Sequence, residues 1–200
     1  MSHEIDRRTA LKIVAVTPIA AALVWTEPEV ARAQLRVAIA LAAGEPYVPR
    51  FFTQAEWQTV RMLSDLIVPK DARSGSATDV GVPEFMDFMM SDQPERQEQM
   101  RTGLKWLDAE TQQRFGHSFL ACNAAQHATL LDEIAWPKRI PEPLKDGAAF
   151  FVSFRNLVLT GFWTSKAGIE DLQYQGNTFV PHWDGCPPAA LQKLGVSYDE

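Results

Sequence analysis

The sequence predicts an all-α fold: a small irregular helical bundle followed by a long non-regular C-terminal tail. Apolar residues recur at helical spacing between Thr53 and Trp163, and capping residues and prolines mark where the segments begin and end. Runs in which β-branched and polar residues alternate, the usual mark of a strand, are absent. The hydrophobic fraction of 46% is typical of a globular chain rather than a disordered one.

The best-marked helix begins after Thr53. Thr53 and Glu56 have the spacing of a capping box, and Pro69 closes the segment. The residues expected to face the core are Trp57, Val60, Leu63 and Ile67. A second helix opens at Val82-Pro83-Glu84, because proline is favoured in the first helical turn.

The middle of the chain predicts three shorter helices. One is expected over Pro94–Leu107 and a separate short one over Asp108–Phe115, which Gly116 ends. Asn123 and Gln126 have the spacing to cap the next one.

The last predicted helix, Ala148–Trp163, is apolar around much of its circumference. We therefore expect it to lie at the centre of the bundle or in an interface. Glycines and prolines recur through Thr164–Glu200, so this segment is expected to be irregular.

The N-terminus resembles a twin-arginine export signal. In Asp6-Arg7-Arg8-Thr9-Ala10-Leu11-Lys12 an arginine pair precedes an apolar residue and a lysine, with departures from the pattern at Asp6 and Ala10. An uncharged apolar stretch, Ile13–Trp25, follows; it is shorter than the roughly 20 residues that span a bilayer and suits the apolar region of a signal peptide. The residues expected to direct export are Arg7, Arg8, Leu11 and Lys12.

Ala31-Arg32-Ala33 fits the small-x-small rule for signal peptidase, with Ala31 and Ala33 as the small residues. The mature chain is therefore expected to begin at Gln34. This divides the chain into a signal peptide (1–33), a linker (34–50) and a helical domain with its tail (51–200). The alternative is a buried or amphipathic N-terminal helix that carries an arginine pair by chance.

Common cofactor and catalytic motifs are missing from the sequence. It contains no G-x-G-x-x-G, C-x-x-C-H, G-x-S-x-G or H-E-x-x-H pattern, and we predict no catalytic, cofactor-binding or metal-binding residue. His117 and His127 flank Cys122, but a metal site wants three or four ligands, so ordinary capping or surface histidines are favoured. The same holds for His182, for which a packed loop side chain is favoured. The net charge of -6 gives nucleic-acid binding no electrostatic support.

Cys122 and Cys186 are the two cysteines of the chain. An exported protein meets an oxidising compartment, in which disulfides persist. A bridge between the two, a bridge from one of them to a partner chain, and two free thiols all stay open, because sequence does not fix connectivity.

Several motifs, in order, resemble the gluconate 2-dehydrogenase subunit 3 family. They are Phe51-Phe52-Thr53-x-x-Glu56-Trp57, Leu66-Ile67-Val68-Pro69, Gly81-Val82-x-Glu84-Phe85, Gly161-Phe162-Trp163-Thr164-Ser165 and Leu172-x-Tyr174-x-Gly176-Asn177. The tail Asn177–Cys186 is similar to a glucoside 3-dehydrogenase branch of that family.

The resemblance implies a mostly helical, non-catalytic small subunit of a periplasmic sugar or polyol dehydrogenase. Its partner would be a catalytic subunit of the glucose-methanol-choline family that holds FAD, and in many such complexes a cytochrome c subunit with haem c is a third component. The small subunit would carry the signal read by the twin-arginine translocase and assist maturation of the flavin subunit. The expected contacts with that partner are Phe162, Trp163, Tyr174, Gly176, Asn177 and Trp183. An exported enzyme acting alone and a solitary binding or scaffold protein of the cell envelope are the alternatives.

Overall fold

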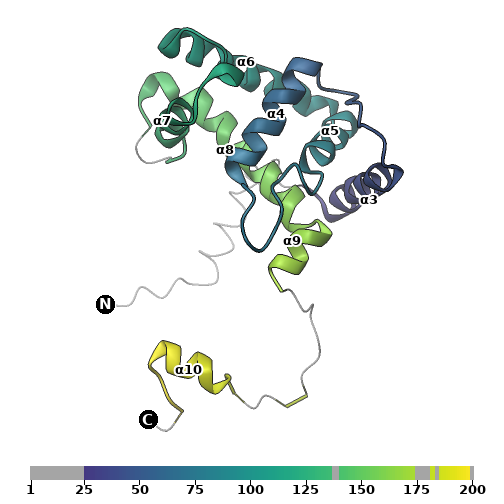
Figure 1. The fold of residues 1–200 in the computed structure, drawn as a ribbon, viewed down its shortest axis with the longest axis vertical. Coiled ribbons are helices and arrows are strands. Elements are labelled where there is room, and N and C mark those ends of the chain that lie inside the picture. Colours follow the sequence, from purple (N-terminus) through teal and green to yellow (C-terminus); the bar gives the residue numbers. More distant parts are fainter. Residues whose placement is uncertain (1–24, 137–139, 174–180, 183–184, 199–200) are drawn as a thin grey trace, which may run out of the picture.

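Helices make up most of the chain in the computed structural model, which describes residues 25–136, 140–173, 181–182 and 185–198 (Figure 1). No strand occurs among these residues, so the predicted all-α class is confirmed. The α-helices are α3 (Glu27–Ala43), α4 (Gln54–Ile67), α5 (Val82–Asp92), α6 (Gln97–Phe115), α7 (Ala124–Ile134), α8 (Lys145–Trp163), α9 (Lys166–Asp171) and α10 (Pro188–Leu194). Single 3-10 turns occur at η1 (Pro94–Arg96), η2 (Phe119–Ala121) and η4 (Glu142–Leu144).

Two helices form the centre of the bundle. α5 is buried on every side from Val82 to Met90 and is packed between α3, α4 and α8. α8 runs across the bundle and contacts α3, α4, α5, α6, α7 and α9, which confirms the central position predicted for it. The burial of α5 was not foreseen, because Glu84 and Asp87 make its sequence look amphipathic.

The predicted helix ends that carry caps are confirmed. Thr53 precedes α4, and its hydroxyl accepts a hydrogen bond from the Glu56 amide at 3.3 Å. Asn123 caps α7 by accepting from the Gln126 amide at 3.0 Å. Gly116 ends α6 in the left-handed conformation, with φ of 81°.

Two helices were predicted over Pro94–Leu107 and Asp108–Phe115, and that prediction was wrong: residues 94–96 form η1, and residues 97–115 form the single helix α6. Asp108 does not interrupt it, because its exposed side chain reaches forward to accept a hydrogen bond from the Phe119 amide at 2.9 Å. α8 also begins three residues earlier than predicted, at Lys145.

The predicted linker over residues 34–50 also differs from the structure. Residues 34–43 belong to α3, and only residues 44–50 connect it to the segment before α4. α3 is stable here because its alanines favour helix and because Val37 packs over Gly81. At the start of α3 the Glu29 carboxylate accepts from both the amide and the hydroxyl of Thr26, at 2.9 and 2.7 Å.

The tail is less irregular than predicted. Ser165 caps α9, and α10 forms further along, with Gly195 ending it at φ of 66°. No residue of α10 is buried, and Figure 1 shows it apart from the bundle. Among the described residues, no helix combines the length and the apolar character that a membrane crossing needs.

Candidate partner-binding surface

Two of the six predicted partner contacts lie in the part of the chain that the structure describes. Phe162 and Trp163 form the C-terminal end of α8. Phe162 is 1% exposed, so its side chain belongs to the core and is not available to a partner. Trp163 is 36% exposed and rests edge-on against Phe162, with ring centroids 5.0 Å apart. Lying outside the described residues are Tyr174, Gly176, Asn177 and Trp183.

The turn from α8 into α9 is tightly built. Ser165 donates its hydroxyl to the Phe162 carbonyl at 2.7 Å and accepts from the Gly168 amide at 3.1 Å. A side chain at Gly168 would collide with the backbone, because its Cβ would lie 2.0 Å from the Phe162 oxygen. Gly161 likewise leaves room for the ring of Phe85 on α5. The Gly161–Ser165 motif therefore fixes the direction in which Trp163 points.

Apolar side chains are exposed around this turn. Ile169 and Leu172 follow Trp163 along the chain and are both exposed. We call Trp163, Ile169 and Leu172 the α8–α9 corner. Rigid aromatic residues with apolar neighbours are the usual anchors of protein interfaces.

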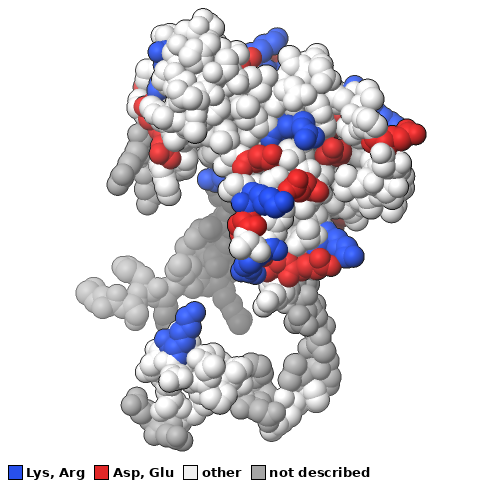
Figure 2. All heavy atoms as spheres, viewed as in Figure 1, with Lys and Arg blue, Asp and Glu red and all other residues white. Residues whose placement is uncertain are grey.

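Charged groups border the corner. The Arg73 guanidinium, in the loop after α4, pairs with the Asp171 carboxylate at 3.0 Å and donates to the Asp171 carbonyl. An open groove of about 400 Å³ lies between this loop and α9. Figure 2 shows positive and negative side chains interleaved on the face that carries α4 and α9. Such a rim can set the orientation of a partner.

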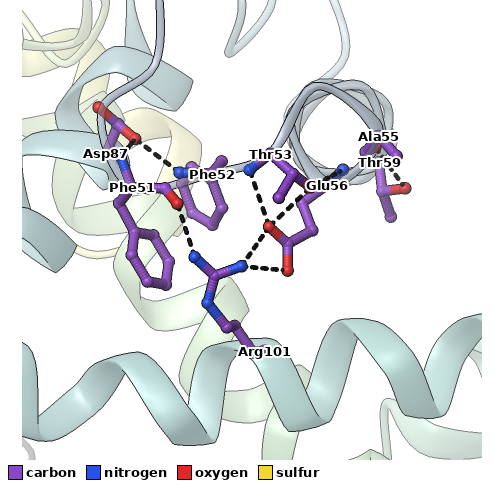
Figure 3. Close-up of polar contacts among 8 residues, drawn as sticks. All are labelled: Phe51, Phe52, Thr53, Ala55, Glu56, Thr59, Asp87 and Arg101. Carbon is purple, nitrogen blue, oxygen red and sulfur yellow. Dashed lines mark hydrogen bonds and ion pairs between the residues drawn. The ribbon is translucent and has the colours of Figure 1, made fainter.

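At the start of α4, the Phe51–Glu56 motif forms a polar cluster with Arg101 (Figure 3). Arg101 donates to both oxygens of Glu56 at 2.6 Å and to the Phe51 carbonyl at 2.7 Å. Its guanidinium also lies 4.4 Å from the centre of the Phe51 ring. Burial acts to raise the pKa of Glu56, but the hydrogen bonds from Thr53 and Arg101 outweigh it and leave that pKa lowered. The cluster links α4 to α6 through the pair of Glu56 with Arg101.

A second cluster centres on Asp87 of α5. Its carboxylate accepts from the Tyr47 hydroxyl at 2.7 Å and from the amides of Arg50, Phe51 and Phe52 at 2.8, 2.9 and 3.2 Å. All these donors are more than 30 residues from Asp87 in sequence, and no sequence motif predicts these hydrogen bonds. Asp87 thereby fixes the path of the chain into α4.

The histidines flanking Cys122 hold local structure. His117 Nε2 lies 3.1 Å from Gln126 Oε1, and His127 Nε2 lies 2.8 Å from the Phe119 carbonyl oxygen. Over the described part of the chain, no three His, Cys, Asp or Glu side chains gather as a metal site would require.

The two cysteines are free thiols in this structure. Cys122 is buried and its thiol lies 3.5 Å from the Ser118 carbonyl oxygen, whereas Cys186 is exposed. The structure thus has no bridge between Cys122 and Cys186, and a bridge from one of them to a partner chain stays a prediction.

The residues predicted to direct export are only partly described by the structure. Arg7, Arg8, Leu11 and Lys12 fall outside the described residues, and Ala31 and Ala33 both belong to α3.

Comparison with known families decides what kind of chain this is. A family model described as gluconate 2-dehydrogenase subunit 3 matches residues 54–185. The chain belongs to this family. The match runs from the start of α4 beyond α9, so it includes the α8–α9 corner, whereas α3 precedes it. No curated protein and no solved structure matches the chain.

The family is described as subunit 3 of gluconate 2-dehydrogenase, which is a dehydrogenase made of several subunits. The sequence motifs that carried the resemblance coincide with particular contacts in the structure. Phe51 and Glu56 meet Arg101, Gly81 receives Val37, and Gly161 receives Phe85. Three of the motifs thus contain residues that join separate parts of the bundle.

Proposed function

We propose that this subunit 3 protein is the non-catalytic small subunit of a periplasmic dehydrogenase that oxidises a sugar or polyol. Its partner is a catalytic subunit of the glucose-methanol-choline family that holds FAD, and a cytochrome c subunit with haem c completes the complex. The small subunit carries the signal for the twin-arginine translocase, travels with the flavin subunit and supports its maturation.

Three features support the proposal. Family membership supplies the association with a dehydrogenase complex. The arginine pair Arg7-Arg8 before Leu11-Lys12 supplies the export route, which carries folded proteins and so suits a partner that must load FAD before crossing. The sequence offers no dinucleotide-binding motif of its own.

The observation that carries the partnership is the α8–α9 corner. Its central Trp163 packs edge-on against the buried Phe162, next to the capped turn at Ser165, yet stays 36% exposed. Holding a tryptophan in one orientation before binding reduces the entropy lost on association. We therefore place the contact with the flavin subunit at this corner.

The corner is tested by substituting Trp163→Ala in the full chain, co-expressed with the flavin subunit. We expect the free energy of binding to the flavin subunit to weaken by about 2 kcal/mol, the usual loss when a tryptophan buried in an interface is replaced by alanine. The matched control is Trp136→Ala, because Trp136 is exposed near the end of α7, in a different part of the bundle. Co-purification, flavin absorbance and dye-linked dehydrogenase activity are measured for each variant.

Circular dichroism must show that both variants keep their helices. A folded Trp163→Ala protein that binds like the parent would move the interface elsewhere. If no flavoprotein accompanies even the parent chain, the assignment as a dehydrogenase subunit fails. Sugar oxidation by the purified small subunit alone would instead support an independent enzyme.

A further inference from the structure

We infer that the mature protein keeps the whole of α3, because folding protects the bond after Ala33 from signal peptidase. The inference rests on the export route proposed above and changes the position of the mature N-terminus. In place of a start at Gln34, the first residue lies at or before Trp25.

Both residues that flank the predicted cleavage bond are held by the bundle. Ala33 is 2% exposed, within the face of α3 that packs on the core. The Gln34 side-chain amide donates to the Gly161 carbonyl at 2.8 Å and to the Thr164 hydroxyl at 2.9 Å. The peptide bond between Ala33 and Gln34 therefore lies in the middle of α3, and the Gln34 side chain is hydrogen-bonded to the C-terminal end of α8.

Contacts on either side of the bond hold the rest of α3. On the C-terminal side, Val37 is buried against Gly81, whose Cβ, if it had one, would lie 2.6 Å from Val37 Cγ1. One residue earlier, Arg36 pairs with Asp92 of α5 at 2.7 Å. On the N-terminal side, the Arg96 guanidinium lies 4.0 Å from the centre of the Trp25 ring.

Endopeptidases bind their substrates in an extended conformation, so the segment around Ala33 has to leave the helix before it is cut. In a folded protein such cleavage occurs only through local opening. Opening α3 would expose Ala33 and Val37 and break the hydrogen bonds of Gln34. A chain that crosses the membrane already folded presents α3 closed, although Ala31-Arg32-Ala33 has the right residues for cleavage.

The first test is the mass of the intact protein recovered from the periplasm, with a tag at its C-terminus. We expect a mass that includes residues 25–33. A protein beginning at Gln34 would overturn the inference.

The second test does not depend on export. The purified full chain is incubated with signal peptidase, alongside Val37→Asp and Ile39→Asp. Val37→Asp places a charge in the buried contact with Gly81, whereas the matched Ile39→Asp adds the same charge to the same helix at a side chain that is 63% exposed. We expect Val37→Asp to be cut after Ala33 at least tenfold faster than the parent and Ile39→Asp.

Equal cutting of all three proteins would overturn the inference, since α3 would then give no protection. A Val37→Asp protein that has released α3, as judged by limited proteolysis, and still resists signal peptidase would overturn it as well. A full-length chain found only in the cytoplasm counts against the proposed export, and the second test still decides the protection of the bond.

Discussion

Asp87 shows how one buried carboxylate can fix a stretch of chain. Its oxygens accept four hydrogen bonds from residues 47–52, and its side chain has no exposure to solvent. These donors satisfy the charge that burial would otherwise make costly. Asp87 is at once a core residue and the anchor of the segment between α3 and α4.

Replacing Asp87 with Asn should destabilise the protein by about 3 kcal/mol, because an amide group would turn donor hydrogens toward amides that also donate. The control is Asp92→Asn on the same helix, which removes a partly exposed pair with Arg36 and should cost about 1 kcal/mol or less. Urea unfolding gives both free energies. Equal losses would mean that Asp87 is not the anchor described here.

Glu84, one turn before Asp87, is a buried acid with an oxygen that lacks a hydrogen-bond partner. Burial raises its pKa above the ordinary value of 4.5, the helix backbone and Arg61 oppose the shift, and Asp87 adds to it. A raised pKa in the folded state means that the folded protein holds its proton more tightly than the unfolded chain does. The contribution of Glu84 to stability is therefore complete below pH 4.5 and is lost as the pH rises through the folded pKa.

The neutral variant Glu84→Gln should remove this pH dependence. We expect the unfolding free energy of the variant relative to the parent to increase between pH 4 and pH 7, measured by urea unfolding at both values. A difference that stays constant over this range would show that Glu84 titrates alike in the folded and unfolded states.

At the scale of elements, α6 and α8 interlock through reciprocal pairs of glycine and aromatic residues. Gly103 of α6 leaves room for Phe150 of α8, whose ring would lie 1.8 Å from an added Cβ. Gly147 of α8 does the same for Trp106 of α6, at 2.1 Å. Each helix thus carries one small and one large residue at the contact, which sets both their separation and their register.

Gly103→Ala should destabilise the protein by about 2 kcal/mol, the cost of overpacking a close contact. This is opposite to the gain of about 1 kcal/mol that alanine brings to an isolated helix. Thr102→Ala, at the exposed neighbouring position, controls for helix propensity and should be neutral or stabilising. Adding Phe150→Leu to Gly103→Ala should recover part of the lost stability. If the double variant is no more stable than Gly103→Ala, the overpacking is not against Phe150.

The sequence predicted local features of the helices but not contacts between helices, such as that of Gly103 with Phe150. Caps are local signals, so Thr53, Asn123 and Gly116 marked helix ends correctly. The pairing of Gly103 with Phe150 depends on how two helices meet, and no local pattern contains that information. α3 was missed for a related reason: its alanine-rich sequence fits a linker after a signal peptide until Val37 is seen to pack over Gly81.

The candidate surface was predictable in part. The predicted helix Ala148–Trp163 ends at the residue where α8 ends, but the capped turn that follows it was expected to be irregular. Sequence alone did not show that Phe162 faces the core and Trp163 faces outward. Adjacent helical residues point in directions about 100° apart, and which of the two directions faces the core depends on the position of α5.

At the scale of the whole molecule, α3 packs against the bundle and follows the segment that is predicted to direct export. We predict that the twin-arginine pair moves a folded chain, and with it the flavin subunit that is proposed to dock at the α8–α9 corner. Export of the enzyme would then depend on two arginines of a different polypeptide.

Replacing Arg7 and Arg8 with lysine keeps the charge of the N-terminus and removes only the guanidinium groups. We expect both this chain and the flavin subunit to stay in the cytoplasm, with periplasmic dehydrogenase activity reduced at least tenfold. The matched control is Arg32→Lys, which makes the same exchange at an exposed residue of α3 and should leave export unchanged. Fractionation with marker enzymes for each compartment measures the result. Normal periplasmic amounts of both proteins with the lysine pair would rule out the twin-arginine route, and loss of this chain alone would show that the flavin subunit travels by itself.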